Sequence, residues 1–373
     1  MKKVLAIVLI LAMALSMAAC GSSGGSQTTA APTSTDGSAA PSASSENFED
    51  QGYKVAYIIG SDPSDVFQLQ NDAAKEEASS LGMSVDFYFA SADASSIQDY
   101  FQRCINQGYD AIYCHGANAT YSYEMIKPAL DAGIVVVAME YECRDPEGNV
   151  PKGVVEMKQD DHSMSAAICD YAVDVLFPDK DVVNVLRLYQ DVAFDPFIRR
   201  NAALQEYVDS GKVNIVETVG VTDSSNAFNS IYTNVSAILP VVGNEIDMIW
   251  SVYDLYAEAA YMAVTDAGLN IPIVTVDVSN EDLTYMTAPN SCFMACASPA
   301  PQSIGQQAIR LIAMMLHGDE VESEYELAAT LIPQDKLKAG ASVTNLQDMV
   351  DGYGTSDDHQ PDWMKEVKAR VAG

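Results

Sequence analysis

The sequence predicts an α/β protein with two lobes, each built on a parallel β-sheet. From residue 54 onward, short apolar runs rich in Val, Ile and aromatic residues alternate with longer amphipathic segments, as in βαβ units. Ile134–Met139 is apolar at every position, which is typical of a strand covered on both faces. The alternation stops at a polar interval, 143–152, and then starts again, which indicates a second lobe of the same design.

The first series contains four predicted strands, at 55–59, 85–90, 111–115 and 134–140. Helical segments near 64–81, 95–107 and 121–132 lie between them. Gly82, Gly108 and Gly133 each follow a helical segment, where a residue with positive φ is favoured. These glycines therefore mark helix ends.

The second series repeats the pattern, with predicted strands at 182–189, 214–221, 247–253 and 271–278. Helical segments near 197–210, 225–239 and 254–267 separate them. A strand at 292–298 and a helix at 304–316 with one apolar face come next. A strand near 325–332 and a tail with a short helix around 362–371 complete the chain.

The first twenty residues predict an export signal. A charged start precedes the apolar run Val4–Leu15, which is shorter than the roughly 20 residues that cross a bilayer. Met17-Ala18-Ala19-Cys20 resembles the lipobox of bacterial lipoproteins, and this resemblance implies that Cys20 becomes a lipid-bearing N-terminus. Residues 1–20 would then be the signal peptide, and the protein would be anchored on the extracytoplasmic face of the cell membrane. Residues 21–52, rich in Ser, Thr, Gly and Ala, are expected to form a disordered tether.

The composition excludes several classes of function. A formal net charge of −32 without a cluster of basic residues argues against nucleic acid as a partner. The internal cysteines have no CxxC spacing and do not group with the histidines, so we expect no metal site. They are either buried thiols or, in part, disulfides: Cys104, Cys114, Cys143, Cys169, Cys292 and Cys296. No cofactor is expected, and the protein is predicted to be a monomer.

Several short motifs follow one another in a particular order. They are Ser64-Asp65-Val66-Phe67, Gly108-Tyr109-Asp110-Ala111-Ile112, Ala132-Gly133-Ile134-Val135-Val136-Val137, Asp160-Asp161, Arg200 before Ala203-Leu204, Tyr253-Asp254 and Val274-Thr275-Val276-Asp277. In this order they resemble the type I periplasmic-binding-protein family, specifically its ribose/galactose-like lipoproteins of ABC importers. The resemblance covers about residues 53–335.

The resemblance implies two Rossmann-like lobes joined by a hinge of three crossings, with a ligand between the carboxyl ends of the strands. The first lobe would comprise residues 53–142 and 299–318, and the second 152–293 and 326–337. Residues 338–373 would form a C-terminal tail.

The resemblance also implies which residues bind the ligand. A sugar or polyol needs carboxylates and a guanidinium for its hydroxyls and aromatic rings for its apolar face. The main candidates stand at predicted strand ends or helix starts: Phe67, Glu140, Tyr141, Arg200, Tyr253 and Asp277. Secondary candidates are Ser64, Tyr189, Asp195 and Phe228. A helix cap at Asp277 and a core position for Phe67 are the alternative interpretations.

The predicted function is capture of a small polar solute, a monosaccharide or polyol, by hinge closure, and its delivery to an ABC permease. A lipoprotein that presents a sugar-like signal to a membrane receptor has the same sequence pattern. No nucleophile motif occurs, so an enzyme is not expected, although Glu140 and Asp277 leave a surface hydrolase as a weaker alternative. We further expect Arg200→Ala and Asp277→Ala to abolish binding with little effect on the melting point.

Overall fold

Two six-stranded sheets organise the chain, as expected for a two-lobed α/β fold. The computed structural model describes residues 48–60, 65–90, 94–116, 122–192, 194–354 and 356–373. The first sheet has the order β11-β5-β4-β3-β1-β2. All of its strands are parallel: β1 (Lys54–Ile59), β2 (Ser84–Phe89), β3 (Ala111–His115), β4 (Val135–Met139), β5 (Val154–Gln159) and β11 (Glu324–Leu327).

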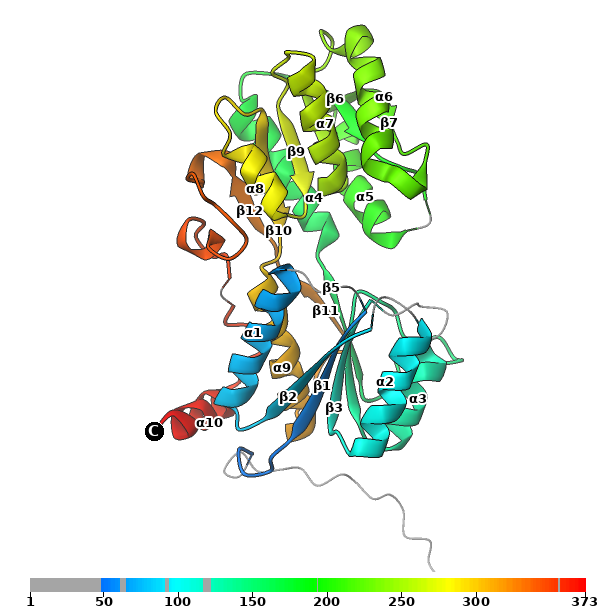
Figure 1. Cartoon of the computed structure of the whole chain (residues 1–373), viewed down its shortest axis with the longest axis vertical. Helices are drawn as coiled ribbons and strands as arrows, with labels where there is room; N and C mark the ends of the chain where they lie inside the picture. Colours follow the sequence, from blue (N-terminus) through cyan, green and yellow to red (C-terminus); the bar gives the residue numbers. More distant parts are fainter. Residues whose placement is uncertain (1–47, 61–64, 91–93, 117–121, 193, 355) are drawn as a thin grey trace, which may run out of the picture. The chain divides into compact units, whose positions relative to one another are not determined.

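Helices cover both faces of the first sheet, and its inner strands β1, β3 and β4 are buried along nearly their whole length (Figure 1). The helices are α1 (Asp65–Ser80), α2 (Ala94–Gln107), α3 (Ser122–Asp131) and α9 (Pro301–His317). Successive residues of β1 point to opposite faces: Tyr57 packs in the core under α1 and α9, whereas Ile58 packs in the core under α2 and α3. This sheet and its helices are called the first lobe below.

Helix α9 lies far from α1 in the sequence but packs directly against it. The contact is close at Gly305, where a Cβ atom would lie 2.2 Å from the backbone oxygen of Gln70. The Gln70 amide in turn donates to the hydroxyls of Tyr57 (2.7 Å) and Tyr113 (2.6 Å), whose rings stack at 3.9 Å. Gly305 therefore allows α9 to pack closely against α1.

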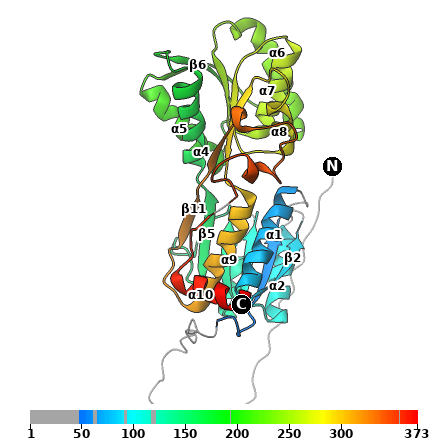
Figure 2. The same ribbon diagram turned by 90° about the vertical axis from the view of Figure 1, so that its left-hand side faces the viewer.

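The second sheet has the order β12-β10-β9-β8-β6-β7. Its strands are β6 (Val183–Leu188), β7 (Val213–Val219), β8 (Met248–Ser251), β9 (Ile273–Val276), β10 (Phe293–Ser298) and β12 (Thr330–Pro333), and only β12 is antiparallel to its neighbour among the described pairs. The helices are α4 (Asp161–Asp170), which continues as a π-helical segment over Tyr171–Leu176, α5 (Asp195–Asp209), α6 (Ala227–Val242), α7 (Asp254–Asp266) and α8 (Asn280–Met286). Figure 2 shows α4 and α5 on one face and α6, α7 and α8 on the other. This sheet and its helices are the second lobe.

Strand pairing corrects two of the predicted lobe boundaries. Residues 152–160 were expected in the second lobe, but β5 pairs with β4 and β11 in the first sheet. The predicted strand near 325–332 is two strands, β11 in the first sheet and β12 in the second. The chain therefore changes sheet after Gln159 and again after Leu327, later than the sequence suggested.

The missed strand β5 has a physical explanation. Glu156 interrupts its apolar run, although the residue is buried and its carboxylate pairs with Arg144. Arg144 also donates to Glu324 on β11 at 3.1 Å. A buried acid that looks like a loop residue in the sequence is thus a paired strand residue.

The C-terminal tail connects the two lobes a fourth time. Val343, Leu346, Val350 and Tyr353 are buried in the core of the second lobe. Helix α10 (Asp362–Ala372), close to the predicted 362–371, then buries Met364 and Val367 in the core of the first lobe. Short 3₁₀ turns also occur at Ser224–Asn226, Gln334–Lys336 and Leu346–Asp348.

The sequence left the pairing of the cysteines open, and the structure shows free thiols. All six cysteines in the described part of the chain are buried and unpaired: Cys104, Cys114, Cys143, Cys169, Cys292 and Cys296. Over the same residues, no helix is both long and apolar enough to cross a membrane.

Candidate functional site

A cavity of about 720 Å³ lies where strands of both sheets end. From the first lobe it is lined by Glu140, Tyr141, Glu142, Glu156, Met157, Lys158 and Gln159. From the second lobe it is lined by Phe194, Asp195, Pro196, Phe197, Arg199, Arg200, Tyr253 and Asp277. Most of these residues stand at or just after the carboxyl ends of parallel strands, where open α/β sheets bind ligands.

Two acidic residues hold corresponding positions in the two lobes. Glu140 directly follows β4, and Asp277 directly follows β9. The two strands have equivalent places in their sheets, since β4 lies between β3 and β5 and β9 lies between β8 and β10. Both residues have a left-handed backbone, with φ of 57° and 69°. Each N–H still donates 2.9 Å to the neighbouring strand, to Met157 and Ala297 respectively. Non-glycine residues adopt this conformation at a cost of about 1–3 kcal/mol, and such strain concentrates at functional sites.

Arg200 is the centre of a buried ion-pair network. Its Nη1 and Nη2 donate to the two carboxylate oxygens of Asp277 at 2.7 and 3.1 Å, and its Nε donates to Asp161 at 2.6 Å. Asp161 is completely buried and also accepts from Arg199, at 2.5 and 3.1 Å. This fork geometry fixes the Asp277 carboxylate in the cavity wall. Burial disfavours the charged form of Arg200, but the two carboxylates outweigh it and raise its pKa above the ordinary value.

Glu140 faces the cavity in a different electrostatic setting. Its Oε1 accepts a hydrogen bond from the backbone N–H of Gln159 at 2.6 Å. Burial raises the pKa of Glu140 to about 7, although that hydrogen bond and the charges of Arg199 and Arg200 oppose the shift. Near neutral pH this carboxyl group can therefore either donate or accept a hydrogen bond to a ligand.

An aromatic wall adjoins the carboxylates. Phe194, Phe197 and Tyr253 line the cavity, and the Phe194 side chain is 51% exposed. The ring of Phe197 lies 5.2 Å from that of Phe194 and 6.2 Å from that of Tyr253, centroid to centroid. An exposed aromatic surface at a strand end can cover the apolar face of a ligand.

Six of the sequence-predicted site residues line the cavity: Glu140, Tyr141, Asp195, Arg200, Tyr253 and Asp277. Phe67, Tyr189 and Phe228 are not among the lining residues. Phe67 packs edge-on against His115 at 5.5 Å, Tyr189 packs beside Arg187, and Phe228 packs against the core of the second lobe. Ser64 and Cys20 lie outside the described residues.

Sequence reasoning missed part of the site. Phe194 and Phe197 were not predicted: Phe194 lies in a segment without a periodic pattern, and nothing in the sequence marks Phe197, in the first turn of α5, as a cavity residue. Asp161 was noted only as part of a helix start, and nothing in the sequence indicates that it supports Arg200 from behind. Lys158 and Gln159 were missed together with strand β5.

The cations that line the cavity all have carboxylate partners. Lys158 lies 3.4 Å from Glu326, Arg199 pairs with Asp161, and Arg200 pairs with Asp161 and Asp277. An anionic ligand would have to compete with these carboxylates for the same donors. The site is therefore better suited to uncharged hydroxyl groups than to phosphate or carboxylate groups.

Comparisons with known proteins support the fold. A crystal structure of a sugar ABC transporter from Yersinia enterocolitica is 28% identical and covers 85% of this chain and 95% of its own, with a TM-score of 0.67. A 5-methylthioribose transporter solute binding protein from Thermotoga lettingae, in complex with 5-methylthioribose, is 22% identical, with coverage of 87% and 99% and a TM-score of 0.67. An ABC transporter solute binding protein from Agrobacterium vitis with bound allitol is 22% identical, with coverage of 80% and 98% and a TM-score of 0.60.

At 22% identity, the last two similarities establish the fold alone. A comparison with curated proteins finds no match. The family model described as the periplasmic binding protein domain matches residues 55–320, which is most of the chain and includes every described residue of the cavity wall. The chain therefore belongs to the periplasmic binding protein family, whose members bind solutes and are not enzymes.

Proposed function

We propose that this protein is an extracytoplasmic lipoprotein that captures a small, uncharged, polyhydroxylated ligand, a monosaccharide or polyol, for an ABC importer. The proposal depends on one observation: Glu140 from the first lobe and Asp277 from the second lobe both line a single cavity. The names of similar structures, which include a sugar ABC transporter and proteins with bound 5-methylthioribose and allitol, support the same ligand class.

Four wall residues have a defined part in the proposed binding. Asp277, held in the fork of Arg200, accepts hydrogen bonds from ligand hydroxyls through lone pairs that the guanidinium leaves free. Glu140 donates or accepts, depending on its protonation. Phe194 and Tyr253 cover the apolar face of the ligand. A charged hydrogen bond contributes about 1.5–3 kcal/mol, so two or three of them supply part of a micromolar affinity of about −8 kcal/mol. Burial of the apolar face of the ligand against the rings supplies the rest and offsets the association costs.

Binding from both lobes would favour hinge closure. A ligand that contacts Glu140 in the first lobe and Asp277 in the second gains more in a closed arrangement than in an open one, and this difference shifts the conformational population. No covalent step is needed. The hinge segments are those where the chain changes sheet, between β5 and α4, between β10 and α9, and between β11 and β12, together with the tail.

A thermal-shift screen tests the ligand class. Purified protein is melted with ribose, 5-methylthioribose, allitol, inositol and, as an anionic comparison, ribose 5-phosphate. A true ligand at 100 times its dissociation constant should stabilise the protein by about 2.7 kcal/mol. We expect a neutral compound to give this shift and ribose 5-phosphate to give none; a stronger shift with the phosphate ester would contradict the proposal.

Matched variants locate the binding. Asp277→Asn keeps the shape of the side chain and tolerates the left-handed backbone, so a weakened ligand-induced shift would reflect lost hydrogen bonding. Glu142→Gln is the control, because Glu142 also lines the cavity but its side chain is 60% exposed. Equal ligand shifts in both variants would remove Asp277 from the proposed site.

The proposed anchor is tested separately through Cys20. Cells that express the full chain are fed a labelled fatty acid and then fractionated. We expect label in the membrane-bound protein, and no label with release from the membrane for Cys20→Ser. Membrane retention of Cys20→Ser at the wild-type level would overturn the lipid anchor without affecting the ligand proposal.

A further inference from the structure

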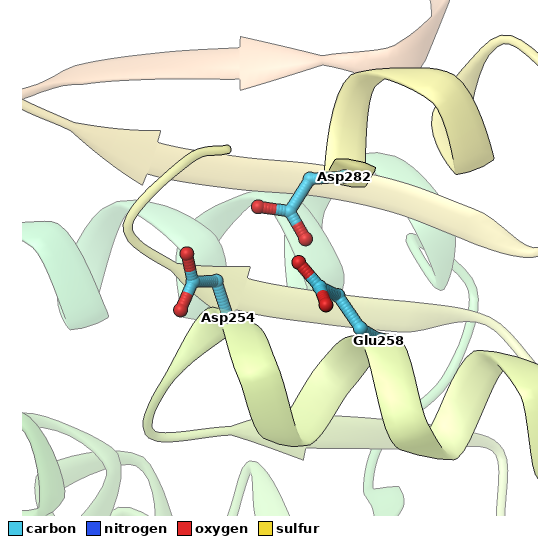
Figure 3. A group of neighbouring side chains, drawn as sticks. All are labelled: Asp254, Glu258 and Asp282. Carbon is cyan, nitrogen blue, oxygen red and sulfur yellow. The ribbon is translucent and has the colours of Figure 1, made fainter. Parts of the chain in front are cut away.

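Three carboxylates of the second lobe converge next to the ligand cavity without lining it. Asp254 and Glu258 lie on α7, and Asp282 lies on α8 (Figure 3). Each offers one oxygen, and the three oxygens lie within 4.8 Å of one another. None of the three residues belongs to the cavity wall described above.

Local structure accounts for this arrangement. Asp254 and Glu258 are four residues apart and therefore share one face of α7. Asp282 is the third residue of α8 and completes a capping box with Ser279. The Ser279 hydroxyl donates to Glu258 at 2.9 Å, and its backbone N–H donates to Asp282 Oδ2 at 2.7 Å. Ser279 thus fixes two of the carboxylates but leaves each with a second oxygen.

The second oxygen of Asp282 indicates a missing partner. The Asp282 side chain is completely buried, and its Oδ1 accepts no hydrogen bond from any described residue. A buried, unpartnered carboxylate oxygen is costly unless a proton or a cation reaches it. Figure 3 shows this side chain directed toward Glu258 and Asp254, so that its oxygens point into the cluster.

No ion pair to a lysine or arginine, among the described residues, neutralises the cluster. The positive charge of Arg200 acts on Asp254, but its donors are bound to Asp161, Asp277 and the Val252 carbonyl. Burial raises the pKa values of Asp254, Glu258 and Asp282, and nearby carboxylates raise them further: Asp277 acts on Asp254, Glu281 on Glu258, and Asp254 on Asp282.

We propose that Asp254, Glu258 and Asp282 bind one divalent cation, and that Ca²⁺ is the ion that fits best. Carboxylate oxygens are ligands of hard cations. Ca²⁺ accepts irregular sets of six to eight oxygens at about 2.3–2.6 Å, whereas Mg²⁺ demands near-octahedral geometry and keeps several waters. Three oxygens that all lie within 4.8 Å of one another are close enough to share one Ca²⁺ ion.

The proposed site would act on the ligand-binding wall from behind. Asp254 directly follows Tyr253, and Ser279, which caps α8, is two residues after Asp277. A cation that joins α7 to α8 would hold both wall residues in place. This inference concerns metal binding and stands apart from the identity of the solute.

The test is a melting experiment with Ca²⁺ as the probe and no sugar present. Purified protein is stripped with EDTA, dialysed and melted over a Ca²⁺ titration. We expect saturable stabilisation by several degrees, with a smaller effect of Mg²⁺. Asp282→Asn and Glu258→Gln should each abolish it, because both keep side-chain shape and the acceptor for Ser279 but remove a charged ligand.

Glu281→Gln is the matched control, since Glu281 lies on the same helix and is exposed. It should keep the full Ca²⁺ response. Absence of any stabilisation by Ca²⁺ would overturn the proposal. Equal stabilisation of Asp282→Asn would also overturn it, because Ca²⁺ would then act by screening the negative charges of this acidic protein in general. The sugar-induced shift, measured in EDTA, is independent of either result.

Discussion

Replacing Arg200 tests whether the ion-pair network is structural as well as functional. The sequence led us to expect that Arg200→Ala leaves the melting point of the ligand-free protein nearly unchanged. The structure predicts the opposite, because the Arg200 side chain is only 4% exposed and donates to two carboxylates and a backbone carbonyl. Its removal leaves Asp277 without its guanidinium and Asp161, which is fully buried, with Arg199 alone.

The size of the effect follows from burial. Removing one member of a buried ion pair costs about 3–5 kcal/mol, which corresponds to a fall in melting temperature of about 6–20 °C at roughly 2–4 °C per kcal/mol. Arg199→Ala is the matched comparison. The Arg199 side chain is 28% exposed and pairs with Asp161, whereas Arg200 pairs with both Asp161 and Asp277. Solvent screens that pair, so its loss should cost about 1 kcal/mol, or roughly 2–4 °C.

Tryptophan fluorescence can follow the second lobe alone. The chain has two tryptophans, Trp250 in the core of the second lobe and Trp363 on α10. In a Trp363→Phe background, the fluorescence of Trp250 reports only the lobe that contains Arg200. Melting of Arg200→Ala within about 2 °C of its parent, or an equal loss in Arg199→Ala, would refute the argument from burial.

Three further predictions concern other parts of the fold. Burial raises the pKa of Glu140 to about 7, so its contribution to stability is present below about pH 4.5 and is lost as the pH rises through 7; the difference in melting temperature between pH 5 and pH 8 should shrink in Glu140→Gln but not in Glu142→Gln. Gly305→Ala should destabilise the first lobe by about 1–3 kcal/mol, because the new Cβ would meet the Gln70 oxygen at 2.2 Å; a neutral effect in a denaturant titration would mean that α9 moves away freely. Met364→Ala, at a completely buried position of α10, should cost about 2–5 kcal/mol, and unchanged unfolding would show that the tail adds nothing to the first core.

The sequence predicted the layers of the fold because most strands are apolar on both faces. Runs such as that of β4 carry this signal by themselves, and the repeated series indicated two lobes. The lobe boundaries failed where the chain changes sheet without a turn signal. Between β11 and β12 only Ala328 and Ala329 intervene, so two strands of different sheets resembled one.

The candidate site was predictable in part for the same reason. Glu140 and Asp277 stand at the ends of strands that the sequence marks clearly, so their positions followed from the element order. Phe194 and Phe197 belong to an irregular segment and to the first turn of α5, and their place in the cavity depends on tertiary structure. The carboxylate partners of Arg200, Asp161 and Asp277, are 39 and 77 residues away in the chain, so the sequence does not show that they meet.

Both ends of the described chain are secured to the first lobe. Phe48 is buried with its ring 5.1 Å from that of Trp363, and Glu49 pairs with Arg370 at 2.6 Å, so the segment that enters β1 is clamped by the last helix. If Cys20 carries lipid and the proposed hinge closure takes place, the membrane is attached to this lobe, and the other lobe is the one that moves when the ligand enters and leaves. A fluorophore fused to the C-terminus would therefore report the position of the first lobe. A distance measurement of closure needs its second label on the second lobe, for example at Val241, which is 68% exposed.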